Sequence, residues 1–225
     1  METESPALMR RVRTLLAQKL WMALGLNLLV CLPYFGLQHF VLRPVTWIPP
    51  SALDRAIPFS EASVWLYQSL YLLMPVAPML MVHAEQLRRY ALGMLAMSLA
   101  ANVVFLAFPT AVVRPDPAGA GVGYRTLVQY DAPLHACPSL HAAFAIFSAL
   151  CCTAVFREMR LARGWLAAAW LWTLAILCAT LATKQHVALD LAGGALLAGL
   201  ASRLALWPTR SRHVIVPSPR HTFIP

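Results

Sequence analysis

The sequence predicts an all-α membrane protein, a bundle of six transmembrane helices with both termini on the cytoplasmic side. Of its 225 residues, 60% are hydrophobic and only 12% are charged, which departs from an average soluble domain in both respects. The apolar residues form stretches about as long as a bilayer core, and the basic residues cluster at the ends of these stretches. A water-soluble fold could not bury that much apolar surface.

Six apolar stretches have the length expected of a transmembrane helix. Helices are expected because the stretches lack the alternating pattern of barrel strands, and isolated strands cannot satisfy their backbone hydrogen bonds in lipid. In chain order, the stretches are Leu20 to Val41, Ala62 to Val82, Ala91 to Pro109, Ser139 to Phe156, Trp165 to Thr183, and Val187 to Trp207.

The positions of Lys and Arg predict the orientation. Thirteen of the eighteen lie in the N-terminal tail, in the turns at 82–91 and 156–165, and in the tail from Arg203. Cytoplasmic segments carry such an excess. The segments expected on the outer side are Leu42 to Glu61, Thr110 to Pro138, and a very short one near Lys184.

The apolar stretches follow one another with short connections, which predicts a single domain. We expect residues 1–19 to be a basic cytoplasmic tail, residues 20–207 to be the six-helix transmembrane domain, and residues 208–225 to be a second cytoplasmic tail. The net charge of +9 does not indicate nucleic-acid binding, because the basic residues sit at the ends of apolar stretches rather than on one polar face.

The unusual polar residues lie at the predicted outer ends of the helices. His186 and Asp190 are four residues apart, so their side chains share one face of a helix that starts near Lys184. Asp190 is the only acidic residue in the six stretches, and ionisable groups inside membranes are costly. Its carboxylate could hold one imidazole nitrogen and leave the other free as a nucleophile. The alternative is a structural pair that ties two helices together.

A second candidate lies at the start of the fourth stretch. Pro138 and Ser139 predict a capped helix N-terminus, whose unpaired amides near Ser139 and Leu140 could bind phosphate. His141 would lie beside that phosphate and could protonate a departing alkoxide. Taken alone, however, a capping serine followed by an interfacial histidine is ordinary.

Arg114 and Lys184 are the cations expected nearest to this phosphate site. Arginine binds phosphate through two hydrogen bonds, and lysine acts as a point charge. Each could instead extend along the interface as a solvated cation. Positive neighbours favour an anion over a metal ion, so neither a metal nor another cofactor is expected.

Three segments resemble the signature motifs of the type 2 phosphatidic acid phosphatase superfamily in order and spacing: Phe108 to Pro115, Cys137 to His141, and Thr180 to Asp190. In that family the histidine of the third motif forms a phosphohistidine, its aspartate orients it, and the histidine of the second motif protonates the leaving group. The resemblance therefore implies these roles for His186, Asp190 and His141.

The motifs also depart from the general pattern. Ala107 stands where the family usually has lysine, Ala179-Thr180 where it has Ser-Arg, and Leu140 where it has glycine. These departures, and the stretch from Asp54 to Tyr71, look like the branch of inositol phosphorylceramide synthase and sphingomyelin synthase. Lys184 would then replace the missing cations.

The resemblance implies a membrane lipid phosphatase or phosphotransferase that acts on a lipid phosphate or phosphodiester at the outer face. One alternative is transfer of a phosphoryl headgroup to a lipid alcohol; another is a non-catalytic lipid transporter or scaffold. Expected partners are the lipid substrate and membrane lipids, whereas the acceptor and the oligomeric state stay open.

Sixteen arginines against two lysines suit a GC-rich bacterial genome, so we expect an inner-membrane protein with a periplasmic site.

Overall fold

The computed structural model describes residues 4–206, and the predicted tail at 208–225 lies outside them. Within that range five helices are long and apolar enough to cross a membrane, and each corresponds to one predicted stretch. This confirms a mostly helical protein with the character of a multi-pass membrane protein. The five helices are α2 (Leu16–Leu37), α7 (Ala84–Ala107), α9 (Leu140–Glu158), α10 (Arg163–Ala182) and α11 (Ala188–Leu206).

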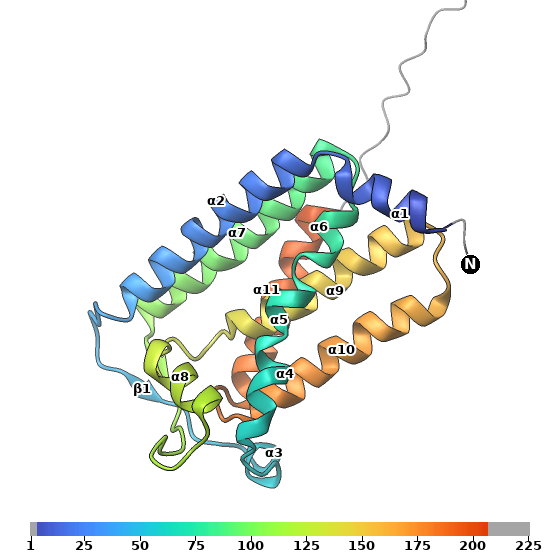
Figure 1. The fold of residues 1–225 in the computed structure, drawn as a ribbon. Helices are drawn as coiled ribbons and strands as arrows, with labels where there is room; N and C mark the ends of the chain where they lie inside the picture. The colour runs from blue at the N-terminus through green and yellow to red at the C-terminus, as the bar shows by residue number, and fades with distance from the viewer. Residues whose placement is uncertain (1–3, 207–225) are drawn as a thin grey trace, which may run out of the picture.

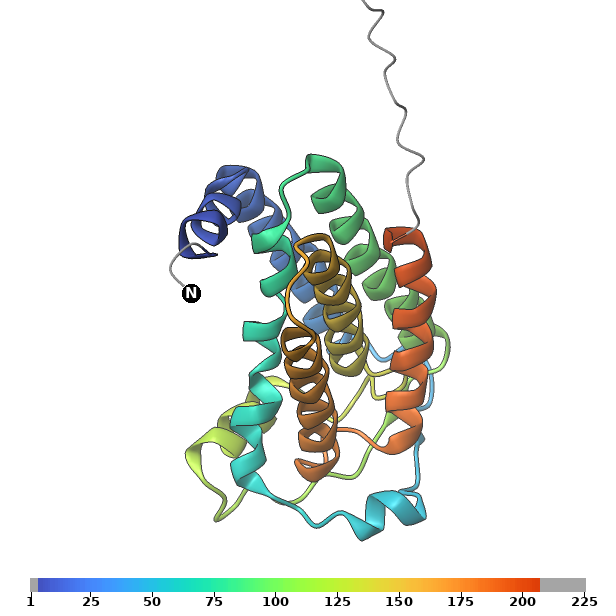
Figure 2. The same cartoon turned by 90° about the vertical axis from the view of Figure 1, so that its right-hand side faces the viewer.

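The remaining stretch, Ala62 to Val82, is not one long helix. It is interrupted at Ser69 and again at Met74–Pro75. At the second interruption Pro75 lacks a backbone N–H, and Pro78, inside the next piece, cannot donate to the Met74 carbonyl. Its pieces still follow one another along the length of the bundle (Figure 2). The number of membrane crossings therefore stays a prediction. The pieces are a 3₁₀ turn (Glu61–Ser63), α4 (Val64–Gln68), α5 (Leu70–Leu73) and α6 (Val76–Leu80).

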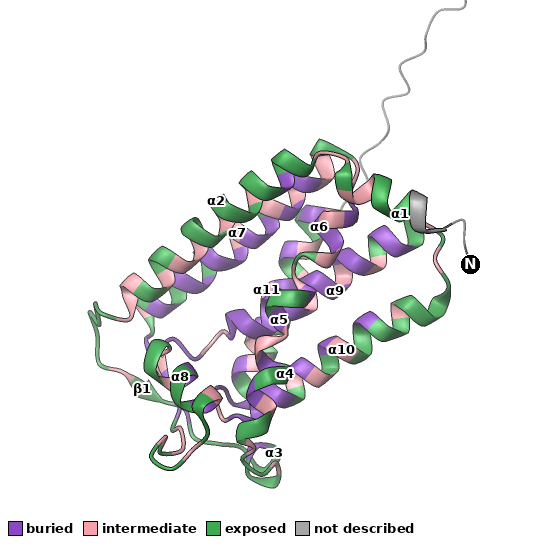
Figure 3. Ribbon diagram, in the orientation of Figure 1, coloured by how far each residue is buried: buried purple, intermediate pink, exposed green. Residues whose placement is uncertain are grey.

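Helix α9 lies at the centre of the bundle. It packs against α10 and α11, while α7 packs against α11 and α2 (Figure 1). Buried residues such as Phe147 face the interior, whereas the outer faces of the long helices are exposed (Figure 3). These outer faces are rich in large apolar side chains, including Trp21, Leu32 and Leu171. Such a surface suits lipid rather than water.

The connections at one end of the bundle hold one another in place. Strand β1 (Thr46–Trp47) pairs in parallel with β2 (Thr110–Ala111), which joins two of the predicted outer segments. The Ser60 amide donates to the Ala182 carbonyl at 2.9 Å and connects the first segment to the end of α10. The same end carries α3 (Ala52–Ala56) and α8 (Val122–Tyr130) (Figure 1).

The opposite end carries α1 (Glu4–Arg13), which contacts α6. Arg11 forms a 3.0 Å ion pair with Glu158. Lys19 is buried and donates to the carbonyls of Arg11, at 2.8 Å, and of Met79, at 2.7 Å. The part of residues 1–19 that the structure describes is therefore helical and packed onto the bundle. The side of the membrane on which the termini lie stays a prediction.

Candidate functional site

His186 and Asp190 meet where α10 turns into α11. Helix α11 begins at Ala188, so His186 lies in the preceding turn. One carboxylate oxygen of Asp190, Oδ2, lies 3.3 Å from His186 Nδ1 and accepts the Val187 amide at 3.0 Å. Asp190 is fully buried. An ionised carboxylate there favours the proton on Nδ1, which leaves the lone pair of Nε2 free.

The start of α11 is bound tightly to the start of α9. The Ser139 amide donates to the Asp190 carbonyl at 3.0 Å. A side chain on Gly194 would place its Cβ 2.4 Å from the Ser139 carbonyl oxygen, so only glycine allows this approach. These two contacts hold the His186–Asp190 pair beside the start of α9, where His141 lies.

Ser139 caps α9 as predicted, and its hydroxyl accepts the Ala142 amide at 3.2 Å. Its own amide is bonded to Asp190, so it is not available to a phosphate. The next two amides, of Leu140 and His141, take part in no hydrogen bond among the residues that the structure describes. Unpaired amides at a helix N-terminus favour an anion. The amides that remain free for an anion are therefore those of Leu140 and His141, whereas the sequence predicts those near Ser139 and Leu140.

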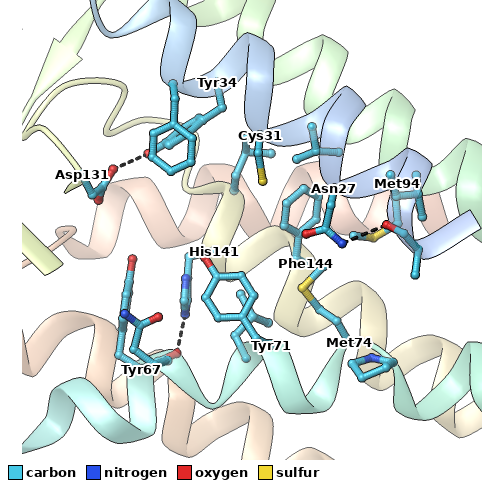
Figure 4. Close-up of a pocket in the computed structure, with 18 of the residues that line it drawn as sticks. Asn27, Cys31, Tyr34, Tyr67, Tyr71, Met74, Met94, Asp131, His141 and Phe144 are labelled. Carbon is cyan, nitrogen blue, oxygen red and sulfur yellow. Dashed lines mark hydrogen bonds between the residues drawn. The ribbon is translucent and has the colours of Figure 1, made fainter. Parts of the chain in front are cut away.

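His141 is held by Tyr67, on the broken segment. The two rings stack with centroids 3.7 Å apart, and His141 Nε2 lies 2.8 Å from the Tyr67 carbonyl oxygen (Figure 4). A carbonyl only accepts, so Nε2 carries a proton and Nδ1 is the nitrogen left for proton transfer. Sequence reasoning did not identify Tyr67 as the residue that orients His141.

Both histidines line one cavity of about 510 Å³. His141 and Asp131 lie at its polar end (Figure 4), and His186 is also a lining residue. From there the cavity runs between α2 and the segment from α4 to α6 as far as Lys19. Its walls along this length are largely apolar, with Leu26 as one example. The shape suits a molecule with a polar head and a long apolar tail.

Arg114 is near the site but already paired. It donates through Nη1 to the Asp131 carbonyl and through Nη2 to the Asp131 carboxylate, the latter at 3.1 Å. Its Nε is buried and has no hydrogen-bond partner in the described chain. Asp131 was missed by sequence reasoning. An acidic residue in the segment that follows the candidate arginine was the only available signal.

Lys184 does not extend into the cavity. Its ammonium group donates to the backbone carbonyls of Asp54, at 2.7 Å, and Ile57, on and after α3. Asp54 in turn accepts the Ala188 amide at 2.8 Å, and so caps α11. Burial alone would raise the pKa of Asp54, but hydrogen bonds from Ser51 and Ala188 and the Lys184 charge lower it overall. We therefore revise the expectation for Lys184: it braces the turn that carries His186.

A third histidine, His135, also lines the cavity. It is 4% exposed, stacks on Phe105 with ring centroids 4.7 Å apart, and has a left-handed backbone with φ of 59°. Burial lowers its pKa, although nearby Asp131 acts in the opposite direction. Sequence reasoning missed His135, because it lies in a connecting segment without a partner nearby in the sequence.

Comparisons with curated proteins and with solved structures give no match. A family model described as the PAP2 superfamily matches residues 37–204, well over half of the 225-residue chain. The matched region contains the two histidines, Asp190 and the residues that position them. Together, the match and the helical membrane-type fold show that this chain belongs to the PAP2 superfamily.

Proposed function

We propose that the protein is an integral membrane lipid phosphatase or phosphotransferase that works through a phosphohistidine on His186. The observation that carries this proposal is the buried Asp190 carboxylate 3.3 Å from His186 Nδ1. A buried carboxylate in that place orients the ring and stabilises the positive charge that develops on it when Nε2 attacks. Membership of the PAP2 superfamily favours the same class of activity.

In the first step, the lone pair of His186 Nε2 attacks the phosphorus of the lipid phosphate. The bond from phosphorus to the lipid oxygen breaks, and that oxygen keeps the electron pair. It takes the Nδ1 proton of His141, which enters this step protonated on both nitrogens and leaves it neutral with its proton on Nε2. The amides of Leu140 and His141 stabilise the equatorial phosphoryl oxygens. The product is a phosphohistidine and a free lipid alcohol.

In the second step, water or an alcohol gives its proton to His141 Nδ1 and attacks phosphorus. The phosphorus–nitrogen bond breaks, and His186 regains its lone pair. The lipid chain occupies the apolar part of the cavity, between α2 and α4 to α6. The apolar lining also limits unproductive access of water to the phosphoenzyme.

The cation-poor end of the bundle carries this site, which supports an outer-face location and a periplasmic site in a bacterial inner membrane. A fluorescent protein that matures only in the cytoplasm tests this orientation when it is fused to the C-terminus. Fluorescence is expected. A dark but stably expressed fusion would place the C-terminus outside the cytoplasm. The candidate site, at the opposite end of the bundle, would then face the cytoplasm.

The experiment that tests the activity uses the purified chain in detergent with a panel of lipid phosphates and phosphodiesters. Free phosphate and lipid products are measured by mass, and acid-labile phosphoenzyme is trapped by rapid quenching. We expect His186→Gln to abolish the phosphoenzyme and to lower turnover by about 10³-fold or more. His39→Gln, at an exposed histidine outside the cavity, is the matched control. Near-normal turnover in folded His186→Gln would exclude the mechanism.

A further inference from the structure

A second polar cluster lines the cavity beside the catalytic histidines. Its centre is Asp131, at the end of α8. Asp131 Oδ1 accepts the Tyr34 hydroxyl at 2.9 Å and the Gln38 amide at 3.0 Å, while Oδ2 accepts Arg114 Nη2 at 3.1 Å. A carboxylate offers about four acceptor positions. Three are filled, so Oδ2 keeps the capacity for one further donor.

His135 supplies a second unfilled position. Its side chain is more than nine-tenths buried, and its Nδ1 has no hydrogen-bond partner among the described residues. Buried polar atoms almost always have a partner, so an unpartnered one in a residue that lines the cavity points to a ligand bound there. The ring is fixed in place by stacking on Phe105 and by edge contact with Tyr34, whose centroid is 6.0 Å away.

The charge of the cluster indicates which ligand fits. The guanidinium of Arg114 and the Asp131 carboxylate neutralise each other. Asp131 and His135 both line the cavity. The carboxylate can accept a hydrogen bond, and the imidazole can accept or donate one, depending on its tautomer. A second phosphate would be repelled by the carboxylate, whereas the O–H groups of a neutral polyol can donate to the carboxylate and can donate to, or accept from, the imidazole.

We propose that Asp131 and His135 form a subsite for a polyol acceptor, which binds through one hydroxyl while another hydroxyl resolves the phosphohistidine. This inference rests on the proposed function above. The reacting hydroxyl gives its proton to His141 Nδ1, its oxygen bonds to phosphorus, and the bond from phosphorus to His186 Nε2 breaks with the electron pair left on nitrogen. The enzyme is then a phosphotransferase that hydrolyses when no polyol is bound.

The test measures how the phosphoenzyme partitions between an alcohol and water. The full-length protein is incubated with the donor lipid of highest turnover, and with glycerol or propan-1-ol at equal concentration. The ratio of transfer product to hydrolysis product is then determined by mass. Because both products arise from one phosphoenzyme, this ratio does not depend on how fast the phosphoenzyme forms. We expect the ratio for glycerol to exceed that for propan-1-ol by about tenfold, since only glycerol can fill the subsite.

Two substitutions assign the preference to the cluster. His135→Phe keeps an aromatic ring on Phe105 but removes both nitrogens, and Asp131→Asn removes the carboxylate charge. Each is expected to lower the glycerol ratio to about that of propan-1-ol. His39→Phe makes the same chemical change at an exposed histidine outside the cavity and should leave the ratio unchanged. If His135→Phe fails to fold, His135→Asn tolerates the left-handed backbone and keeps an acceptor oxygen, so a partial preference is expected.

The outcomes separate this inference from the proposed function. A parent protein that forms the phosphoenzyme and releases phosphate, but does not prefer glycerol, overturns the polyol subsite and leaves the proposed function standing. A preference that survives both His135→Phe and Asp131→Asn also overturns it. If no phosphoenzyme forms with any lipid, the proposed function itself fails.

Discussion

Asp190→Asn is the sharpest perturbation of the proposed mechanism. Asparagine has nearly the same shape as aspartate, and its side-chain oxygen can still accept the Val187 amide, now 3.0 Å from Oδ2. What is lost is the negative charge 3.3 Å from His186 Nδ1. The imidazole of His186 becomes positively charged when Nε2 bonds to phosphorus, so the substitution acts on the transition state more than on substrate binding.

The distance between the Asp190 carboxylate and the His186 ring sets the expected size of the fall in kcat. A hydrogen bond between charged groups contributes about 3 kcal/mol. Coulomb's law at this separation, with an effective dielectric constant of about 20, gives an upper bound of about 5 kcal/mol. At about 1.4 kcal/mol per factor of ten, these limits correspond to a fall in kcat of about 10²-fold to about 5 × 10³-fold. KM should change by about threefold or less, because the charge acts mainly after binding.

The assay is rapid-quench formation of the phosphoenzyme, together with steady-state release of product lipid. Asp116→Asn is the control, because Asp116 is exposed in the connection before α8 and, within residues 4–206, accepts only the nearby Ala118 amide. A folded Asp190→Asn variant with phosphoenzyme formation within about threefold of the parent would refute the reasoning. Asp190 would then be a structural residue that ties α11 to its preceding turn.

Three further predictions concern the frame around the site. Gly194→Ala should destabilise the protein by about 1–3 kcal/mol in thermal or denaturant unfolding, since the new Cβ would lie 2.4 Å from the Ser139 carbonyl oxygen. Lys184→Met should cost about 1.5–3 kcal/mol of stability, because hydrogen bonds from its ammonium group brace the turn. His135 should make stability depend on pH, because burial lowers its pKa below the usual value of about 6.5. Between the lowered pKa and about 6.5 the unfolded chain binds more protons, so stability is lost as the pH falls through that window.

A control variant or a second measurement tests each of these three predictions. Gly199 has no atom within 4 Å of an added Cβ, so Gly199→Ala should be neutral or stabilising, and an equal effect at both glycines would contradict the packing argument. Lys184→Met with normal stability but a KM raised more than about tenfold would restore Lys184 as a phosphate ligand. For His135, the unfolding midpoint at pH 5.5 and 7.5 should differ less in His135→Phe than in the parent.

Local features of the site were predictable because both partners lie close in the sequence. His186 and Asp190 are four residues apart and do meet in the structure. Ser139 caps the helix that starts one residue later. Long apolar stretches likewise predicted the five long helices, because the length of a bilayer core imposes a length on the helices that cross it.

Contacts between distant segments could not be predicted in this way. The stretch from Ala62 to Val82 has the hydropathy of a membrane helix, yet it is interrupted at Ser69 and Pro75. The buried Tyr67 carbonyl, just before the first interruption, then holds His141. Lys184 is bonded 130 residues away, to Asp54. A cation on its own in the sequence indicates a charge, but not the group that neutralises it.

The sequence by itself determined a helical membrane protein with a histidine–aspartate pair and a capped helix start, because helix length, spacing and capping are local properties. Only the tertiary structure decided that Arg114 is neutralised by Asp131, that Lys184 braces a turn, and that the buried Nδ1 of His135, a residue lining the cavity, has no partner among the described residues. The physical reason is that a polar group pairs with a complementary group that is close in space. That partner can be far away in the sequence, so sequence spacing does not identify it.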